Sequence, residues 1–251
     1  MPRYVVHLAY DGTDYFGWQK QPDVQTVQGT VERAIRTVTQ EEVQLYASGR
    51  TDTGVHAESQ YAHFDTHIPL DEGNLNYRLR SLLPDDIHIY KIFQVPEYFH
   101  ARFDAEWRQY RYQLLFQPDP FQNRYSWYPG EKPDPEVIQE CMDLLQGVHD
   151  FAGFSRKSGD LPHSRCTIHL AEIELKADNM MIIRIRANRF LRSMLRAIVG
   201  GMVRVSHGKK SKNWFERQLK EEQELKDTTL APAKGLCLEK VFYPDSAFDL
   251  T

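Results

Sequence analysis

The chain lacks the features that tie a protein to a membrane or to an oxidising compartment. Its three cysteines, Cys141, Cys166 and Cys237, are an odd and scattered set that does not read as a disulfide framework. No apolar run approaches the roughly 18 residues that a membrane span needs. The first residues lack the apolar stretch of a signal peptide. We therefore expect a cytoplasmic protein with no membrane partner.

The chain also lacks an excess of positive charge. Its net charge is −4 at pH 7, which by itself argues against a nucleic-acid partner. The charge is uneven, however. Residues 184–217 contain ten basic residues and one acid, Glu216, which leaves nine net positive charges. Most charge runs are solvated helix faces, but a local basic field of this density attracts phosphate. The segment therefore favours an RNA partner.

Hydrophobic periodicity predicts two α+β halves, over residues 1–104 and 105–251. The first half has the strand–helix–strand–strand–helix–strand order of the ferredoxin-like split motif. Its predicted strands cover 3–10, 43–47, 58–66 and 87–95, and its helices cover 24–39 and 71–83. The second half has predicted strands at 107–116, 167–176, 181–187 and 235–242, and helices at 135–145, 189–205 and 212–224. Two adjacent glycines, Gly200 and Gly201, are costly inside a helix and indicate close packing or close approach of RNA.

The most informative string is G-R-T-D-T-G-V-H-A at residues 49–57, directly after a predicted strand. Glycines let the backbone turn tightly and let a ligand approach closely, and loops that follow strands often carry chemistry. An isolated G-x-x-D-x-G is more often a surface turn. The whole string, however, resembles the active-site stretch G-R-T-D-A-G-V-H of the TruA-type tRNA pseudouridine synthases. Only Thr53 departs from that pattern.

Further strings resemble the same family, in the family's order and over nearly the whole chain. They are Y-D-G-T at 10–13, Y-F-G-W-Q-K-Q at 15–21, T-V-Q-G at 26–29, F-H-A-R-F at 99–103, Y-R-Y at 110–112, F-L-R-S-M-L-R at 190–196, I-V-G at 198–200 and A-P-A-K-G-L at 231–236. One short motif would be weak support, but the ordered series is specific. The resemblance implies a pseudouridine synthase fold, with two ferredoxin-like α+β halves, a mainly antiparallel sheet and a central catalytic cleft.

The resemblance implies that uridine is isomerised to pseudouridine at positions 38, 39 and 40 of the tRNA anticodon stem-loop. In this reaction the N1–C1′ bond breaks and the uracil reattaches through C5. Nothing is added or lost, so no redox cofactor or energy source is required, and the resemblance implies that the enzyme uses no metal and no organic cofactor. A carboxylate is needed near the sugar, as in glycoside hydrolysis, and Asp52 is the candidate. The sequence leaves open whether Asp52 attacks C1′ or removes a proton from C2′.

Three other residues receive roles from the resemblance. Tyr110, the first tyrosine of Y-R-Y, packs on the target uracil; such stacking is worth about 1–3 kcal/mol per base. Arg196 faces the catalytic aspartate and keeps it ionised, and the predicted 189–205 helix places Arg189, Arg192 and Arg196 on one face. Arg50 occupies the space that the uridine vacates when it flips out of the stem. The family also implies a homodimer that grips the tRNA with both subunits.

Other interpretations compete with this one. D-T-G at 52–54 is also the string of retroviral-type aspartic proteases, but they place apolar residues before the aspartate, and several predicted helices oppose an all-β protease. A non-catalytic RNA-binding module suits the basic segment but gives no reason for an aspartate among cations. A metal site is disfavoured. His163, Cys166 and His169 are spaced by three, and His63 and His67 by four, but such spacings alone do not make a convincing metal site.

Overall fold

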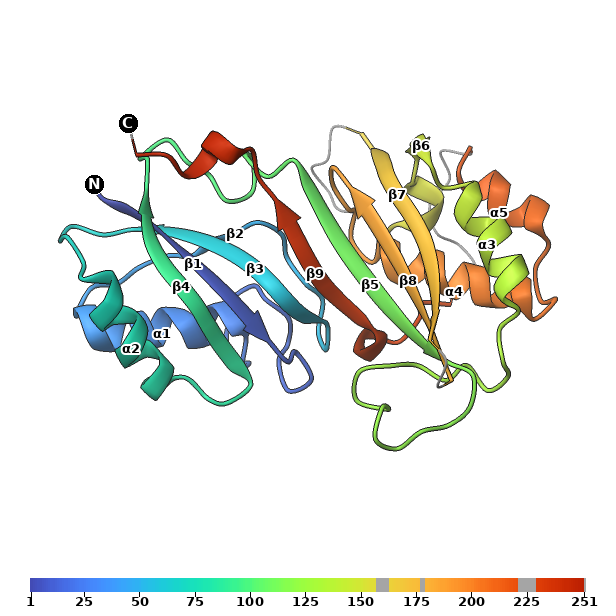
Figure 1. The fold of residues 1–251 in the computed structure, drawn as a ribbon, viewed down its shortest axis with the longest axis horizontal. Coiled ribbons are helices and arrows are strands. Elements are labelled where there is room, and N and C mark those ends of the chain that lie inside the picture. The colour runs from blue at the N-terminus through green and yellow to red at the C-terminus, as the bar shows by residue number, and fades with distance from the viewer. Residues whose placement is uncertain (157–162, 177–178, 221–228, 251) are drawn as a thin grey trace. The chain divides into compact units, whose positions relative to one another are not determined.

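The computed structural model describes residues 1–156, 163–176, 179–220 and 229–250 (Figure 1). The chain divides into two compact units. The first unit comprises residues 1–107 and 237–251, and the second comprises residues 108–236. Both units combine helices with largely antiparallel strands, so the predicted α+β class is confirmed. The division predicted at residues 104 and 105 differs in two respects. The first unit extends to Trp107, and it also includes residues 237–251, which contain all of the last strand except Leu236.

In the first unit the strands follow the order β4-β1-β3-β9. The central strand β1 (Arg3–Tyr10) pairs antiparallel with β3 (His56–Asp65) and with β4 (Ile87–Val95). β9 (Leu236–Phe242) pairs with β3 in parallel. β2 (Tyr46–Ala47) adds two residues beside β3, so it is shorter than the strand predicted there.

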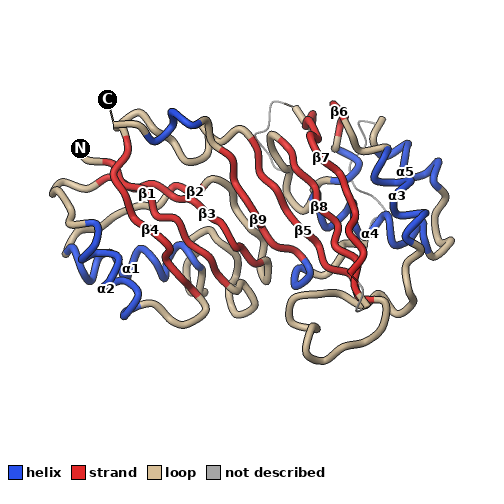
Figure 2. The backbone as a smooth tube through the Cα atoms, in the orientation of Figure 1, coloured by secondary structure: helices blue, strands red, loops and turns tan. Residues whose placement is uncertain are grey.

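Helices α1 (Val27–Thr39) and α2 (Glu72–Leu82) lie next to each other against this sheet (Figures 1 and 2). Each helix begins at a side-chain cap that accepts a hydrogen bond from a free backbone N–H group of the first turn. Thr26 accepts from the N–H of Gly29, and Asp71 accepts from the N–H of Asn74. The predicted helices, 24–39 and 71–83, include these capping residues and extend at most three residues beyond the observed helices at either end.

The face of β1 that carries Val5 is also covered. Val5 is fully buried together with Val95 and Phe99, and Tyr243 and Phe248 from the last segment pack against them. The alternation of residues along β1 therefore does not separate a buried face from a solvated one at this end of the strand.

In the second unit the strands follow the order β5-β8-β7-β6, and every pair is antiparallel. The strands are β5 (Trp107–Leu115), β6 (Gly147–Asp150), β7 (Arg165–Lys176) and β8 (Met180–Ala187). β6 has no counterpart among the predicted strands. The sequence predicts a turn at residues 177–180 between β7 and β8. Residues 177 and 178 lie outside the described residues, and β8 already begins at Met180.

Three helices of the second unit pack with one another: α3 (Pro135–Asp143), α4 (Met194–Ser206) and α5 (Lys212–Gln218). The glycine pair of α4 permits a close approach of neighbouring chain. A Cβ atom at Gly200 would lie 1.9 Å from the carbonyl oxygen of Thr229, and one at Gly201 would lie 3.2 Å from the ring of Phe154. The pair therefore serves packing within the protein.

Helix α4 begins later than the predicted 189–205 helix. Ser193 has a φ of 60°, in the left-handed region, and the N–H of Met194 donates to the carbonyl of Leu191 in a turn. Arg189 and Arg192 therefore precede the helix, and only Arg196 of the predicted arginine face lies on α4. The prediction of one helical face with three arginines is wrong. The end of the predicted 212–224 helix lies outside the described residues.

The sequence predicts no membrane span, no disulfide and no metal site, and the structure bears on these predictions only within the described residues. Within them, no helix is long and apolar enough to cross a membrane. All three cysteines are buried, and none of them forms a disulfide. In the same part of the chain, no three His, Cys, Asp or Glu side chains gather as metal ligands would. On β7, Cys166 is buried whereas His169 is exposed.

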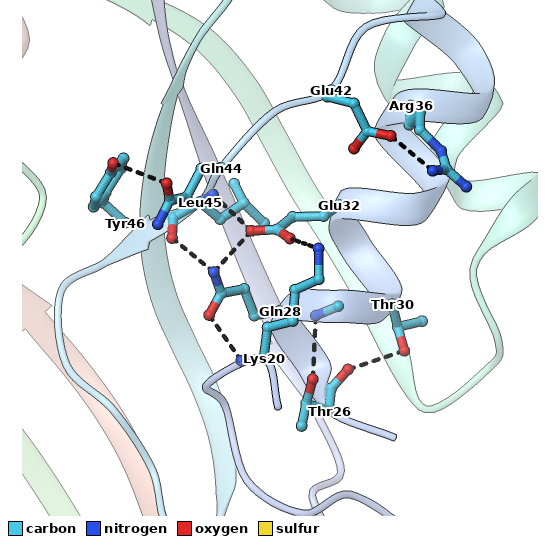
Figure 3. A network of polar contacts seen from close by, with 11 residues as sticks. Lys20, Thr26, Gln28, Thr30, Glu32, Arg36, Glu42, Gln44, Leu45 and Tyr46 are labelled. Atoms are coloured by element: carbon cyan, nitrogen blue, oxygen red, sulfur yellow. Dashed lines mark hydrogen bonds and ion pairs between the residues drawn. The ribbon is translucent and has the colours of Figure 1, made fainter. Parts of the chain in front are cut away.

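A buried polar network fixes the chain just before the loop of residues 49–54 (Figure 3). Glu32 and Gln28 on α1 are 6% and 7% exposed. Oε1 of Glu32 accepts from the N–H of Leu45 at 2.9 Å and from the Gln28 amide at 2.7 Å. The Gln28 amide also donates to the carbonyl of Leu45 at 3.2 Å, and Nζ of Lys20 lies 3.1 Å from Glu32 Oε2. These contacts hold Leu45, which precedes β2 and the loop, against α1.

We predict that Glu32→Ala lowers the free energy of unfolding by about 2–4 kcal/mol. Two buried donors lose their acceptor, and each unsatisfied group costs about 1–3 kcal/mol. Glu32→Gln retains the accepting oxygen and has a smaller effect. Urea denaturation monitored by tryptophan fluorescence measures the change. Glu42→Ala is the control, because Glu42 is 75% exposed in its pair with Arg36 and its loss leaves stability unchanged. Equal effects at Glu32 and Glu42 would contradict the prediction.

Candidate active site

Asp52 stands on the loop between β2 and β3. The loop turns from Asp52 to Val55, where the N–H of Val55 donates to the carbonyl of Asp52 at 3.1 Å. Gly54 has a φ of 76° within this turn, a left-handed conformation that favours glycine. Asp52 is half-buried, and Arg50 in the same loop is exposed. The turn therefore leaves the carboxylate partly open to solvent.

The segment of residues 15–18 packs against the backbone of this loop. The N–H of Trp18 donates to the carbonyl of Thr51 at 3.1 Å, and the N–H of Gly54 donates to the carbonyl of Tyr15 at 3.3 Å. Gly17 has a φ of 83°, and a Cβ atom there would lie 2.6 Å from the carbonyl oxygen of Thr51. Only a glycine permits this approach without a shift of the loop.

Tyr15 is held in turn by Asp86, which lies between α2 and β4. The phenol donates to the Asp86 carboxylate at 2.6 Å, and the N–H of Asp11 donates to the carbonyl of Asp86 at 2.9 Å. Burial, together with the hydrogen bond to Asp86, raises the pKa of Tyr15 above its usual range. The phenol therefore stays protonated and remains a donor at neutral pH.

The end of β1 and the residues that follow it contact the chain on both sides of Asp52. The hydroxyl of Tyr10 lies 2.8 Å from Oγ1 of Thr51, which precedes Asp52. The N–H of Gly12 donates to Nδ1 of His56 at 3.1 Å. A side chain at Gly12 would collide with the loop backbone. The turn that carries Asp52 is thus tied to a central strand.

Sequence reasoning assigned no individual role to Tyr10, Gly17 or His56. All three lie in strings that resemble the family, which was the only available signal. Hydrophobic periodicity does not reveal which residue of such a string touches a loop some forty positions away.

Arg196 lies near the start of α4 and is tied to Ala231 in both directions. The N–H of Ala231 donates to the carbonyl of Arg196 at 2.9 Å, and Nε of Arg196 donates to the carbonyl of Ala231 at 2.8 Å. Arg196 is half-buried. These bonds join the string at 190–196 to the string at 231–236 and restrain the guanidinium group.

Tyr110 and Tyr112 lie on β5 in different surroundings. Tyr110 is 7% exposed and meets the Phe190 ring edge to face, with centroids 5.0 Å apart. Tyr112 is fully buried and donates its hydroxyl proton to the carbonyl of Pro232 at 2.8 Å. A Cβ atom at Gly235 would lie 2.6 Å from the Tyr112 ring. Burial raises the pKa of Tyr112 well above its usual range, so this phenol is a neutral packing residue.

The predicted site residues divide between the two units. Arg50 and Asp52 are two positions apart on one loop of the first unit, whereas Tyr110 and Arg196 belong to the second unit. The structure therefore brings Arg50 and Asp52 together within one unit. The roles of all four residues in a common site remain predictions.

The basic segment of residues 184–217 is less available to a partner than its charge suggests. Arg184 and Lys212 form ion pairs with glutamates, at 2.8 and 2.9 Å respectively. Arg192, Lys209 and Arg217 are exposed. Lys212 is exposed too, but it must leave its ion pair with Glu140 before it can contact phosphate.

Comparison with known proteins gives the family. A family model described as tRNA pseudouridine synthase matches residues 7–104 and 141–244. The tRNA pseudouridine synthase A of Chlorobaculum tepidum is 43% identical over 239 residues, which cover 95% of this chain and 96% of that protein. Its namesake from Porphyromonas gingivalis is 40% identical over 251 residues, and the match covers 99% and 100% of the two chains. The one from Bacteroides thetaiotaomicron is 38% identical over 250 residues, with 99% and 93% covered.

One comparison with a solved structure shows only a weak likeness. A structure of a Cbf5-Nop10-Gar1 complex aligns with 79% of this chain and 53% of the matched chain, at 8% identity and a TM-score of 0.35. A likeness at that level supports no argument. The family model and the relatives together confirm the resemblance seen in the sequence. The chain belongs to the tRNA pseudouridine synthase family.

Proposed function

We propose that this protein isomerises uridine to pseudouridine in tRNA, at positions 38, 39 and 40 of the anticodon stem-loop, with Asp52 as the catalytic carboxylate and without cofactor or metal. The observation that carries this proposal is the setting of Asp52. Its side chain is half-buried, while the neighbouring Thr51 and Gly54 are tied to other segments of the unit. A carboxylate on a restrained loop is pre-organised for reaction at a sugar carbon.

The proposed reaction conserves every atom of the nucleoside. The N1–C1′ bond breaks, the C5–C1′ bond forms, C5 loses a proton and N1 gains one. Asp52 acts either as a nucleophile at C1′ or as a base at C2′, and both roles require the ionised carboxylate. A positioned carboxylate of this kind also handles the electron-poor anomeric carbon in glycoside hydrolysis.

The remaining roles rest on the family resemblance of the strings that contain these residues. Arg196 supplies the cation that faces Asp52 and favours its ionised form. Tyr110 packs on the target uracil. Arg50, exposed on the Asp52 loop, fills the space that the flipped uridine leaves.

The proposal includes the finer features that the family implies. These are two ferredoxin-like halves around a central catalytic cleft, a cytoplasmic location, and a homodimer that grips one tRNA with both subunits. A non-catalytic RNA-binding module is the rival proposal. It shares the exposed basic residues but requires no carboxylate, so a test at Asp52 separates the two.

We predict that Asp52→Asn lowers pseudouridine formation at least about a hundredfold, the scale of removing a positioned acid–base group. Binding of tRNA stays close to native, because phosphate contacts elsewhere hold the RNA. Tritium release from C5-labelled uridine measures turnover, and filter binding measures affinity. Carbodiimide mapping of the native product locates the modified positions. Product formation by Asp52→Asn, or a native product outside positions 38, 39 and 40, would contradict the corresponding part of the proposal.

We predict that Arg196→Ala lowers the single-turnover rate constant at least about tenfold, a loss of roughly 1.4 kcal/mol of transition-state stabilisation. The variant lacks the cation proposed to orient an ionised carboxylate. Arg196→Lys retains the charge and should lose less. Lys209→Ala is the matched control. Lys209 is exposed, and the substitution removes one basic group from the same segment. Thermal unfolding checks that loss of the bond to Ala231 has not unfolded the protein. Equal rate losses at Arg196 and Lys209 would refute the ranking.

We predict that tRNA binding weakens steeply with salt although the protein is acidic overall. Each phosphate that a basic residue neutralises adds about −0.9 to the slope of log K against log salt for a duplex. The double variant Lys209→Glu with Arg217→Glu should flatten that slope by roughly 2, since two such contacts are lost. Arg33→Glu with Arg78→Glu is the control, because both residues are exposed on helices of the first unit. If the slope of log K against log salt changed equally in both double variants, the basic segment of residues 184–217 would not be the RNA-binding surface.

A further inference from the structure

We propose that the hydrogen bond between Tyr10 and Thr51 is a positioning device for Asp52. It sets the carboxylate for the chemical step and contributes nothing to tRNA affinity. Tyr10 and Thr51 are therefore positioning residues. The inference rests on the proposed function and deepens it, since it names groups that act on the reaction through Asp52.

Tyr10 is held in place by its neighbours. It is the last residue of β1, where it stands opposite Ala57 of β3 and Ile87 of β4. Its side chain is 4% exposed, and its ring packs against the Trp18 ring with centroids 5.9 Å apart. A phenol held by two neighbouring strands and by a buried tryptophan keeps its hydroxyl in one place.

Thr51 is restrained at two points by this frame. Its Oγ1 lies 2.8 Å from the Tyr10 hydroxyl, and its carbonyl accepts from the N–H of Trp18 at 3.1 Å. Its side chain is buried, at 7% exposed. Because Thr51 directly precedes Asp52, any rotation of Thr51 swings the Asp52 backbone. The two bonds therefore restrain the approach of the chain to Asp52, whose side chain is half-buried.

The polar character of this contact is not required for packing. A buried pair of hydroxyl groups adds little net stability, and replacement of both partners by apolar groups of the same shape can be nearly neutral. Tyr10→Phe together with Thr51→Val makes that replacement. If the hydrogen bond has a purely structural role, the double variant should regain both the native stability and the native rate. A positioning role predicts that stability returns while the rate stays low.

The experiment compares Tyr10→Phe, Thr51→Val and the double variant with the native protein. Three quantities are measured: the single-turnover rate constant at saturating tRNA, the Kd for tRNA and the temperature of thermal unfolding. We expect all three variants to lose about tenfold to a hundredfold in rate, the scale of a misplaced reacting group. The Kd stays at the native value. The double variant unfolds close to the native temperature.

Tyr4→Phe is the matched control. Tyr4 lies on the same strand, is 2% exposed, and its hydroxyl accepts from the N–H of Leu70 at 2.9 Å. Six residues of strand place it roughly 20 Å from Tyr10. The control therefore loses a buried phenol hydrogen bond of similar length at a distance from the Asp52 loop, and we expect it to keep the native rate.

The outcomes separate the two proposals. A native protein that forms no pseudouridine would overturn the proposed function before any variant is compared. An active native protein with a double variant of native rate would overturn the positioning role. The positioning role would also be overturned by a rate loss in Tyr4→Phe equal to that in Tyr10→Phe, or by a rate loss matched by a weaker Kd.

Discussion

The attachment of the Asp52 loop to the end of β1 is the constraint on which the rest of the site depends. The loop that carries Asp52 belongs to no helix or strand, and the bond from the N–H of Val55 to the carbonyl of Asp52 closes only a turn. Its backbone is also bonded to Tyr15 and Trp18, and Thr51 is bonded to Tyr10. The close approach requires positions without a side chain, which accounts for Gly12 and Gly17. The loop is thus positioned by the same strand that organises the first unit.

The second unit uses a comparable arrangement around Arg196. There, too, strings that are distant in sequence are joined through backbone carbonyl groups. Arg196 and Ala231 exchange two hydrogen bonds, and Tyr112 bonds to Pro232. Strings that look unrelated along the chain therefore form one packed structure, in which a proposed functional side chain is restrained by neighbours that have no chemistry of their own.

Much of the local structure could be predicted because hydrophobic patterns are local signals. The strand over residues 87–95 agrees with the structure, and both helices of the first unit lie within the predicted ranges 24–39 and 71–83. The prediction failed where a single backbone angle decided the outcome. Ser193 adopts a left-handed φ that is uncommon for a residue with a side chain, and the helix begins only after it, at Met194. The arginine face inferred from the longer predicted helix is therefore wrong.

The sequence by itself determined the family, since a nine-residue string and eight further strings in a fixed order are specific without any coordinates. It also singled out Asp52 as the candidate carboxylate, because no other residue of that string can supply the chemistry. Tertiary structure alone decided which residues hold Asp52 in place and which basic residues are exposed. Strand pairing brings Tyr10 to Thr51 across forty-one positions, and ion pairs occupy Arg184 and Lys212. Such contacts join residues that are distant in sequence, and the local patterns of a single sequence contain no record of them.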